Sequence, residues 1–395
     1  MESEQRTDVT ASAVWESLPA FERPLHVGQP NIGDRAVFDS YVDGMFERRW
    51  LSNDGPLVKE FEERIAERAG VRHCVAMSNG TVALEIAVRA LGLSGEVIVP
   101  AYTFVATAHA LHWQGITPVF ADIDPVTHNL DPDAVRAAIT PRTTGIMAVH
   151  LWGRPAPIEE LSRIADEHGL QLLFDAAHAF GVTAHGKPIG GFGRAEIFSF
   201  HATKFFNTFE GGAIVTDDDE VAREARLMRN FGFAGTDNVI SAGTNGKMTE
   251  VAAAMGLTNL QSVDATIETN RRNYQAYRRH LAGIPGVRLS EFDEVEANNF
   301  QYITIELDGT AVSRDDVVAS LTSKNVLARK YFWPGIHRMQ PYRDLYPDAG
   351  ATLPNTERVA DRLIVLPTGT AVDEAAVETI ARMIRILVAG DARDA

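Results

Sequence analysis

The chain has 395 residues, enough for one large or two medium domains with buried cores, and its hydrophobic content of 45% and charged content of 23% are those of an ordinary globular protein. Its formal net charge of −16 argues against a general nucleic-acid or membrane-surface binder, because no basic patch could act far through that field. Cys74 is the only cysteine, which excludes a disulfide framework and a cysteine-based zinc site.

The first segment, residues 1–19, is acidic and polar and contains no basic stretch followed by an apolar one. We therefore expect no signal peptide. No apolar run approaches the roughly 18 residues that indicate a membrane span. The expectation is a soluble, cytoplasmic protein that binds neither nucleic acid nor a membrane.

Short apolar strands alternate with helical stretches from about residue 70 to 216. A helix is expected over 157–168, for example, with Gly169 as its stop signal. Continuous apolar strands separated by helices indicate an α/β fold with a mostly parallel sheet that is covered on both faces. The strands are expected at residues 71–77, 97–99, 118–122, 145–150, 170–175, 197–200 and 213–216.

The remainder of the chain begins with a Gly-, Asn- and Thr-rich segment, 232–248, which is the longest loop-like stretch and is expected to be functional or to lie at a subunit contact. A long helical region over 249–282 leads into a smaller α+β unit. We expect a large domain over 1–260 and a small one over 261–395. Other elements are expected at 220–230 (helix), 301–307 (strand), 313–324 (helix), 363–366 (strand) and 374–387 (helix).

Several familiar motifs are absent or incomplete. Residues 243–248 resemble a P-loop, but Ser241 replaces its first glycine and Met248 replaces the hydroxyl residue that binds magnesium. No G-x-G-x-x-G stands between a strand and a helix, and no G-x-S-x-G is present. No H-E-x-x-H or similar ligand pair occurs either, so we expect no metal site.

Lys204 follows the apolar strand expected at 195–200, and Gly211 and Gly212 lead into the next apolar run. This layout places an amine at the carboxyl edge of the sheet, where open α/β sheets bind ligands. A lysine there can form a Schiff base with an aldehyde cofactor if its surroundings lower its pKa. The alternative is an ordinary surface lysine.

Asp175 ends the strand at 170–175, on the same edge as Lys204. A carboxylate buried there needs a cationic partner, because an unpaired buried charge is costly. The protonated pyridine nitrogen of pyridoxal phosphate is such a partner, and a facing carboxylate keeps that ring an effective electron sink. The alternative is that Asp175 caps a helix beginning at residue 176.

Further residues fit the same cofactor. Gly80 and Thr81 stand in a turn at a helix N-terminus, which is an anion site, and Ser199 could add a second hydroxyl to a phosphate there. Phe104, like Tyr102, could stack on a flat ring, and His178 could donate to a ring hydroxyl. Alternatively these residues are a helix cap, core aromatics and a partly exposed histidine.

Six segments in this order resemble the DegT/DnrJ/EryC1/StrS family of pyridoxal-phosphate sugar aminotransferases, which have the type I, aspartate-aminotransferase-like fold. Together the six segments span most of the chain, and their combination is highly specific to this family. The segments are Ser-Asn-Gly-Thr-Val-Ala-Leu (78–84), Val-Pro-Ala-Tyr-Thr-Phe-Val-Ala-Thr (99–107), Phe-Asp-Ala-Ala-His-Ala-Phe-Gly (174–181), Phe-Ser-Phe-His-Ala-Thr-Lys (198–204), Glu-Gly-Gly-Ala (210–213) and Asn-Gly-Lys-Met-Thr-Glu (245–250).

The resemblance implies a role for each matching residue. Lys204 corresponds to the Schiff-base lysine and marks an aminotransferase, since the family's dehydratases have a histidine there. Asn245 corresponds to an asparagine that reaches the phosphate from the neighbouring subunit, which implies a homodimer with shared active sites. The other matches are Asp175 at the pyridine nitrogen, His178 at the ring hydroxyl, Phe104 stacked on the ring, and Gly80, Thr81 and Ser199 at the phosphate.

The resemblance also implies a substrate. The sequence around Lys204 is similar to that of family members that transfer an amino group from L-glutamate to C4 of a dTDP-4-keto-6-deoxyhexose, in two half-reactions. The corresponding diphosphate-binding residues are Arg329, Lys330, Tyr331 and His337, which would otherwise form a solvated basic segment. The alternatives are a 3-keto sugar nucleotide or keto-cyclitol substrate, and, more distantly, a non-catalytic regulatory protein that binds the cofactor.

Overall fold

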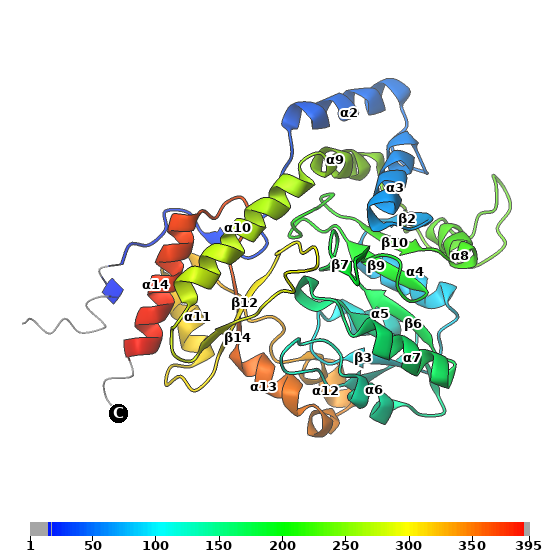
Figure 1. Cartoon of the computed structure of the whole chain (residues 1–395). Coiled ribbons are helices and arrows are strands. Elements are labelled where there is room, and N and C mark those ends of the chain that lie inside the picture. The colour runs from blue at the N-terminus through cyan, green and yellow to red at the C-terminus, as the bar shows by residue number, and fades with distance from the viewer. Residues whose placement is uncertain (1–14, 17, 391–395) are drawn as a thin grey trace, which may run out of the picture.

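A seven-stranded sheet forms the centre of the larger part of the protein (Figure 1). In the computed structural model, which describes residues 15, 16 and 18–390, strand β10 runs antiparallel to its neighbours β2 and β9, and the other neighbouring strands are parallel. The predicted α/β fold with a mostly parallel sheet is confirmed. In spatial order the strands are β2 (His73–Met77), β10 (Gly212–Thr216), β9 (Ala195–Ser199), β6 (Gln171–Asp175), β5 (Thr143–Val149), β3 (Glu96–Pro100) and β4 (Thr117–Ala121).

Both faces of this sheet are buried, which is why its strands read as continuous apolar runs. In β6, Leu172 and Phe174 belong to one apolar cluster, while Leu173 between them belongs to the cluster on the other face. The first cluster is completed by α3 (Pro56–Ala69), α6 (Pro132–Ala138), α7 (Ile158–His168) and α9 (Glu250–Leu260), and the second by α4 (Gly80–Ala90), α5 (Ala106–His112) and α8 (Asp219–Arg229).

The smaller part is built on a three-stranded antiparallel sheet with the order β11-β12-β14. Leu18 and Leu25, near the N-terminus, pack in its apolar cluster, although they belong to the range predicted as the large domain. The division at residue 260 stays a prediction. The elements are β1 (Leu25–His26), α10 (Val263–Leu281), β11 (Val287–Leu289), β12 (Ile303–Leu307), α11 (Arg314–Ser323), β13 (Val326–Leu327), α12 (Tyr342–Leu345), α13 (Pro354–Arg362), β14 (Leu363–Leu366) and α14 (Glu374–Gly390).

The structure differs from the expected elements at several places. The helical region predicted over 249–282 is two helices, α9 and α10, which meet at Gln261 and Ser262. Helix α2 (Arg35–Arg48) and helix α3 precede the sheet and were not predicted, and α2 lies over α9 at the edge of the molecule (Figure 1). Short elements complete the fold: β7 (Thr183–Ala184), β8 (Lys187–Pro188) and the 3-10 turns Leu151–Gly153, Ile336–Arg338 and Ala349–Thr352.

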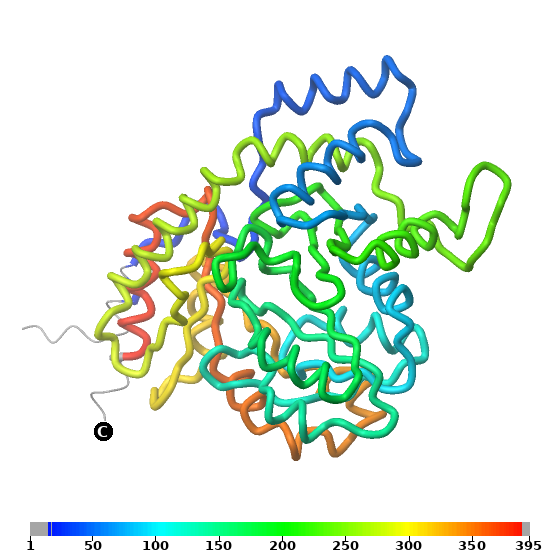
Figure 2. The backbone as a smooth tube through the Cα atoms, turned by 45° about the vertical axis from the view of Figure 1, so that its right-hand side comes forward, coloured from blue at the N-terminus to red at the C-terminus, as the bar shows by residue number. Residues whose placement is uncertain are grey.

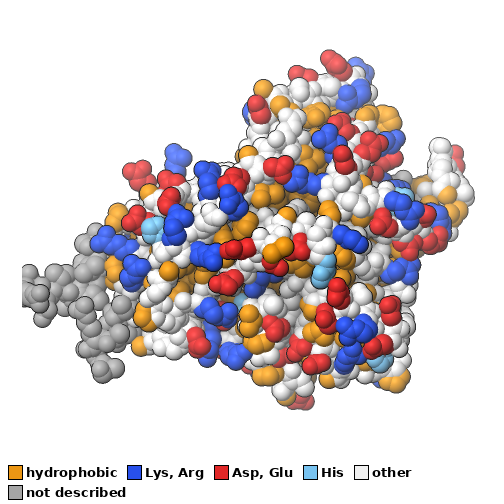
Figure 3. Space-filling model, viewed as in Figure 1, with side chains coloured by type: hydrophobic (Ala, Val, Ile, Leu, Met, Phe, Trp, Pro, Cys, Tyr) orange, Lys and Arg blue, Asp and Glu red, His pale blue; other side chains and the backbone are white. Residues whose placement is uncertain are grey.

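The surface has one projecting segment. Residues 232–245 form a loop that extends away from the end of α8 and returns to it where Asn245 pairs with Asn230 (Figure 2), and Val239 and Ile240 within the loop are 57% and 55% exposed. Residues 246–248 run back into the body, where Gly246 and Met248 are buried. Acidic and basic side chains are interspersed over the face seen in Figure 3. Within the described residues, no helix combines the length and the hydropathy needed to cross a membrane. Residues 1–14, part of the segment expected to lack a signal peptide, lie outside the described residues.

Candidate active site

A cavity of about 600 Å³ opens at the carboxyl edge of the large sheet, where the two parts of the protein meet. It is bounded by the start of α4, the ends of β6 and β9, and residues of the smaller part. The structure therefore brings together residues that are far apart in sequence. Of the predicted site residues, those lining the cavity are Gly80, Thr81, Phe104, Asp175, His178, Ser199, Lys204, Arg329 and Tyr331.

The Lys204 amine lies inside this cavity. A turn after β9 positions it, since the Lys204 backbone N–H donates to the His201 carbonyl over 2.8 Å. Its Nζ donates to the hydroxyl of Tyr302 over 3.3 Å. Burial lowers the pKa of Lys204 from its ordinary value of 10.5 to about 8, although the carboxylate of Asp175 acts in the opposite direction. An amine in this state is partly neutral near physiological pH.

Asp175 ends β6 and is only 5% exposed. Its Oδ2 accepts from the Thr107 hydroxyl over 2.9 Å, and its Oδ1 accepts from the Ala177 backbone N–H over 3.1 Å. Among the described residues it has no ion-pair partner within 4.0 Å, and burial raises its pKa. No helix begins at residue 176, so the helix-cap alternative does not hold. The carboxylate can therefore pair with a bound cation, since none of the described residues forms an ion pair with it.

His178 is held in one protonation form. The Trp152 backbone N–H donates to its Nδ1 over 3.2 Å, so Nδ1 carries the lone pair and Nε2 carries the hydrogen. Burial, together with the nearby charge of Lys204, lowers the pKa of His178 well below its ordinary value. The neutral ring can therefore donate a hydrogen bond through Nε2.

The start of helix α4 forms a close-fitting anion cradle. Asn79 caps the helix, its Oδ1 accepting from the Val82 N–H over 2.9 Å, and the N–H groups of Gly80 and Thr81 follow in the first turn. A Cβ on Gly80 would lie 3.0 Å from the Cβ of Ser199, and one on Gly212 would lie 2.6 Å from the backbone of Asn79. Side chains at either position would crowd the cradle, whose third wall is Ser199.

The two candidate stacking aromatics have different surroundings. Phe104 lines the cavity and is 57% exposed, so its ring is open to a ligand. Tyr102 is buried, and its hydroxyl donates to the Tyr331 carbonyl over 2.5 Å. Tyr102 is thus a core residue behind the cavity, as the alternative of a core aromatic predicted.

Three predicted site residues lie outside the cavity. Lys330 pairs with Asp315 over 3.2 Å, and His337 is buried with its Nε2 3.0 Å from Glu357. Asn245 is exposed on the projecting segment, where it pairs with Asn230. The roles of these three stay predictions. Two further residues, Tyr302 and Thr107, contact Lys204 and Asp175 respectively and were not predicted from the sequence.

The family of the chain follows from comparison with known proteins. A model of the DegT/DnrJ/EryC1/StrS aminotransferase family matches residues 34–385. The chain belongs to this family. The predicted membership is confirmed, and with it the enzyme class: the protein is an aminotransferase.

Individual relatives resemble it over almost their whole length. A dTDP-4-amino-4,6-dideoxy-D-glucose transaminase from Escherichia coli is 37% identical over 367 residues, covering 92% of this chain and 98% of the relative. A GDP-perosamine synthase from Caulobacter vibrioides is 36% identical over 356 residues, covering 88% and 95%. A crystal structure of DesI with its TDP-sugar product is 51% identical and superposes with a TM-score of 0.89, covering 94% of this chain and 95% of that one.

Proposed function

We propose that the protein binds pyridoxal phosphate in this cavity and transfers the amino group of L-glutamate to the 4-keto group of a nucleotide-linked sugar. The acceptor is of the dTDP-4-keto-6-deoxyglucose type, and the products are 2-oxoglutarate and a dTDP-4-amino-4,6-dideoxyhexose. One observation carries the proposal: a buried amine, Lys204, shares the cavity with a buried carboxylate, Asp175, that has no cation of its own among the described residues.

The described residues fit pyridoxal phosphate. Asp175 would hold the protonated ring nitrogen, which supplies the missing cation. The helix start at Gly80 and Thr81, together with Ser199, would hold the phosphate. Phe104 would lie on the ring, and His178 would donate from Nε2 to the ring hydroxyl.

The chemistry divides between the cofactor and the protein. Bound pyridoxal phosphate supplies an aldehyde that reacts with amines and a ring that withdraws electrons from the reacting carbon. Lys204 would hold the aldehyde at rest, and its neutral Nζ, once released, would take a proton from the substrate carbon that bears the nitrogen and deliver it to the cofactor carbon on the other side of that nitrogen. Asp175 would keep the ring nitrogen protonated, and the neutral, fixed His178 would orient the ring.

The relatives support the nucleotide sugar as acceptor. One is named for a dTDP-linked 4-amino sugar, and the DesI structure contains a TDP-sugar product. Arg329 is exposed at the cavity with its guanidinium 5.0 Å from the Tyr331 ring, where it would contact the diphosphate. We propose the same for Lys330 and His337. Since another relative is a GDP-perosamine synthase, a GDP-linked sugar is the second candidate.

We also propose that two copies of the chain form a homodimer with shared active sites. Asn245 is exposed at the base of the projecting segment, where it pairs with Asn230, and it does not line the cavity of its own chain, as expected of a residue that acts on a partner's site. The exposed apolar side chains of Phe231, Val239 and Ile240 on or beside this segment give it a surface that a partner would cover.

Incubation of the reconstituted protein with L-glutamate and a keto-sugar nucleotide tests the proposal. Mass spectrometry should find 2-oxoglutarate and an aminated sugar nucleotide, formed faster from the dTDP-linked sugar than from its GDP-linked counterpart. Lys204→Ala should form neither, while Lys187→Ala, which removes an exposed lysine of β8, should behave as wild type. Turnover by Lys204→Ala at the wild-type rate would contradict the proposal.

A further inference from the structure

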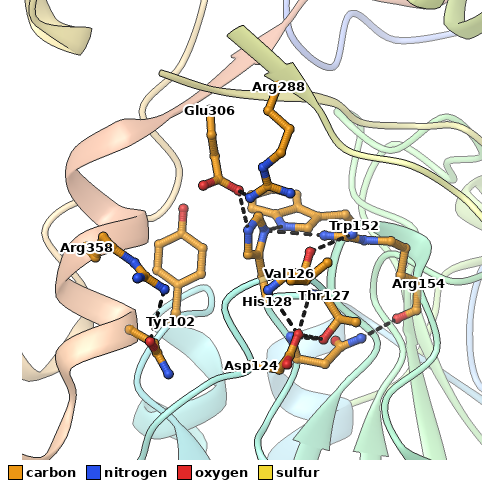
Figure 4. A network of polar contacts seen from close by, with 12 residues as sticks. Tyr102, Asp124, Val126, Thr127, His128, Trp152, Arg154, Arg288, Glu306 and Arg358 are labelled. Atoms are coloured by element: carbon orange, nitrogen blue, oxygen red, sulfur yellow. Dashed lines mark hydrogen bonds and ion pairs between the residues drawn. The ribbon is translucent and has the colours of Figure 1, made fainter. Parts of the chain in front are cut away.

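Buried polar contacts join Glu306 of the smaller part to His128 and Trp152 (Figure 4), and Trp152 in turn contacts His178 in the active site. His128 stands at the centre of this contact chain and is fully buried. Its Nε2 lies 2.8 Å from Oε1 of Glu306, on β12. Its Nδ1 accepts from the indole N–H of Trp152 over 3.2 Å and from Arg154 over 3.3 Å.

These partners fix the protonation of the His128 ring. An indole N–H and a guanidinium only donate, so Nδ1 must carry the lone pair, and a carboxylate only accepts, so Nε2 must carry the hydrogen. Burial lowers the pKa of His128, which keeps the ring singly protonated. Although burial acts the other way, hydrogen bonding to His128 and the charge of Arg288 lower the pKa of Glu306, which keeps it a carboxylate.

Trp152 joins His128 to the active site. Its backbone is left-handed, with φ 62° and ψ 11°, a conformation that costs a bulky residue energy and must be held by its surroundings. The indole stacks on Phe332 at 5.2 Å between ring centroids and on His178 at 5.9 Å. In this conformation the Trp152 backbone N–H points at Nδ1 of His178.

We propose that His128 and Glu306 are positioning residues that act on His178 through Trp152. Glu306 keeps the hydrogen of His128 on Nε2, so Nδ1 of His128 can accept from the indole of Trp152 and hold it in place. The backbone N–H of Trp152 then donates to Nδ1 of His178, which leaves the hydrogen of His178 on Nε2, where it can be donated to a ligand. Because Glu306 belongs to the smaller part, the packing of that part against the large sheet determines the orientation of the His178 Nε2–H donor. The catalytic consequence, though not the contact chain, rests on the proposed function.

Histidine-selective ¹⁵N NMR of the cofactor-free protein tests the contact chain directly, because a ring nitrogen with a hydrogen and one with a lone pair have well-separated shifts. His178→Gln assigns the two signals of His178. Wild type should show a hydrogen on Nε2 only. Trp152→Phe keeps the ring stack but loses the anchoring N–H, and His128→Leu loses the acceptor. Both should move the two His178 signals toward one another.

Two variants serve as controls. His128→Asn keeps an acceptor near the Nδ1 position and tolerates the left-handed backbone of residue 128, with φ 63°, so it should retain the wild-type signals. Thr127→Val disturbs the same turn by removing a hydroxyl bonded to Asp124 and should also retain them. Unchanged His178 signals in Trp152→Phe, or equal changes in Thr127→Val, would overturn the proposal.

Kinetics of the reconstituted enzyme test the consequence. Trp152→Phe and His128→Leu should lower kcat by about 10-fold, the effect expected from the loss of one hydrogen bond, with KM for the sugar changed less than about twofold. A fall confined to KM would overturn the positioning role. If wild type shows the predicted NMR pattern but no turnover with any amino donor, the proposed function fails while the contact chain stands.

Discussion

Tyr302 and Lys204, 98 positions apart in sequence, meet in the cavity with the phenol oxygen 3.3 Å from the lysine amine. One comes from the smaller part of the protein and the other from the edge of the large sheet. This contact therefore forms only when the two parts are packed together. Burial also raises the pKa of Tyr302, which keeps the hydroxyl protonated beside the amine.

Removal of this hydroxyl should slow the reaction without unfolding the protein. Tyr302→Phe loses one hydrogen bond of ordinary strength, so we expect kcat to fall by about fivefold. Tyr346→Phe, a partly buried phenol away from the cavity, is the matched control. Steady-state rates with L-glutamate measure both, and equal rates for Tyr302→Phe and wild type would show that the contact does not serve catalysis.

The negative charge of Asp175 should matter more than its size. Asp175→Asn retains the shape but loses the charge opposite the proposed ring nitrogen, so we expect kcat to fall by about 10²-fold to 10³-fold. Thr107→Val removes one hydrogen bond to the carboxylate and leaves the charge. Its kcat should fall by no more than about 10-fold. Similar losses in the two variants would mean that orientation, and not charge, is what Asp175 provides.

The depressed pKa of Lys204 predicts a dependence of stability on pH in the cofactor-free protein. Between pH 8 and 10.5 the unfolded chain holds a proton that the folded chain has lost, so stability contributed by this group rises with pH through that window. Below pH 8 Lys204 is protonated in both the folded and the unfolded chain. The buried charge then lowers the free energy of unfolding by roughly 3 kcal/mol, which corresponds to the difference between the pKa values of 10.5 and about 8.

Lys204→Met should therefore stabilise the cofactor-free protein by roughly 3 kcal/mol at pH 7, and by progressively less as the pH approaches 10.5. Urea unfolding of both proteins at pH 7 and pH 10 measures the difference. The same difference at the two pH values would show that the lysine is not held in a charge-disfavouring environment.

Most of the large sheet was predictable because its strands are buried on both faces and end at a common edge. That alone places Asp175 and Lys204 near one another. Helix α2 was missed because it fully buries only Met45 and so has no apolar stripe. The break between α9 and α10 has no glycine or proline. At this point the Asn259 side chain instead donates to the Asn207 carbonyl and accepts from the Gly33 N–H.

The missed site residues have a common cause. Tyr302 directly precedes β12 and reads as a core residue of a buried strand, and nothing local shows that its hydroxyl reaches Lys204. The 3.0 Å contact of His337 Nε2 with Glu357 is likewise made by tertiary packing and has no local signal in the sequence, while the role of His337 at the substrate diphosphate stays a prediction. Residue type and spacing locate a site at a sheet edge, whereas contacts across the two parts depend on how they pack.

Shared active sites predict complementation between two inactive variants. Lys204→Ala damages the cavity of its own chain, whereas Asn245→Asp, which places a negative charge near the phosphate, damages the partner's cavity. Mixed dimers then contain one intact site, so random reassortment should restore roughly a quarter of wild-type activity. Sites built within single chains would give no recovery.

The visible absorption of the reconstituted protein tests the central claim, that Lys204 holds pyridoxal phosphate which accepts an amino group from L-glutamate. We expect the purified protein to retain a yellow absorption band after free cofactor is removed, and the band to shift to shorter wavelength when L-glutamate is added. Lys204→Ala should lack the resting band. A wild-type protein that stays colourless after incubation with pyridoxal phosphate would contradict the account.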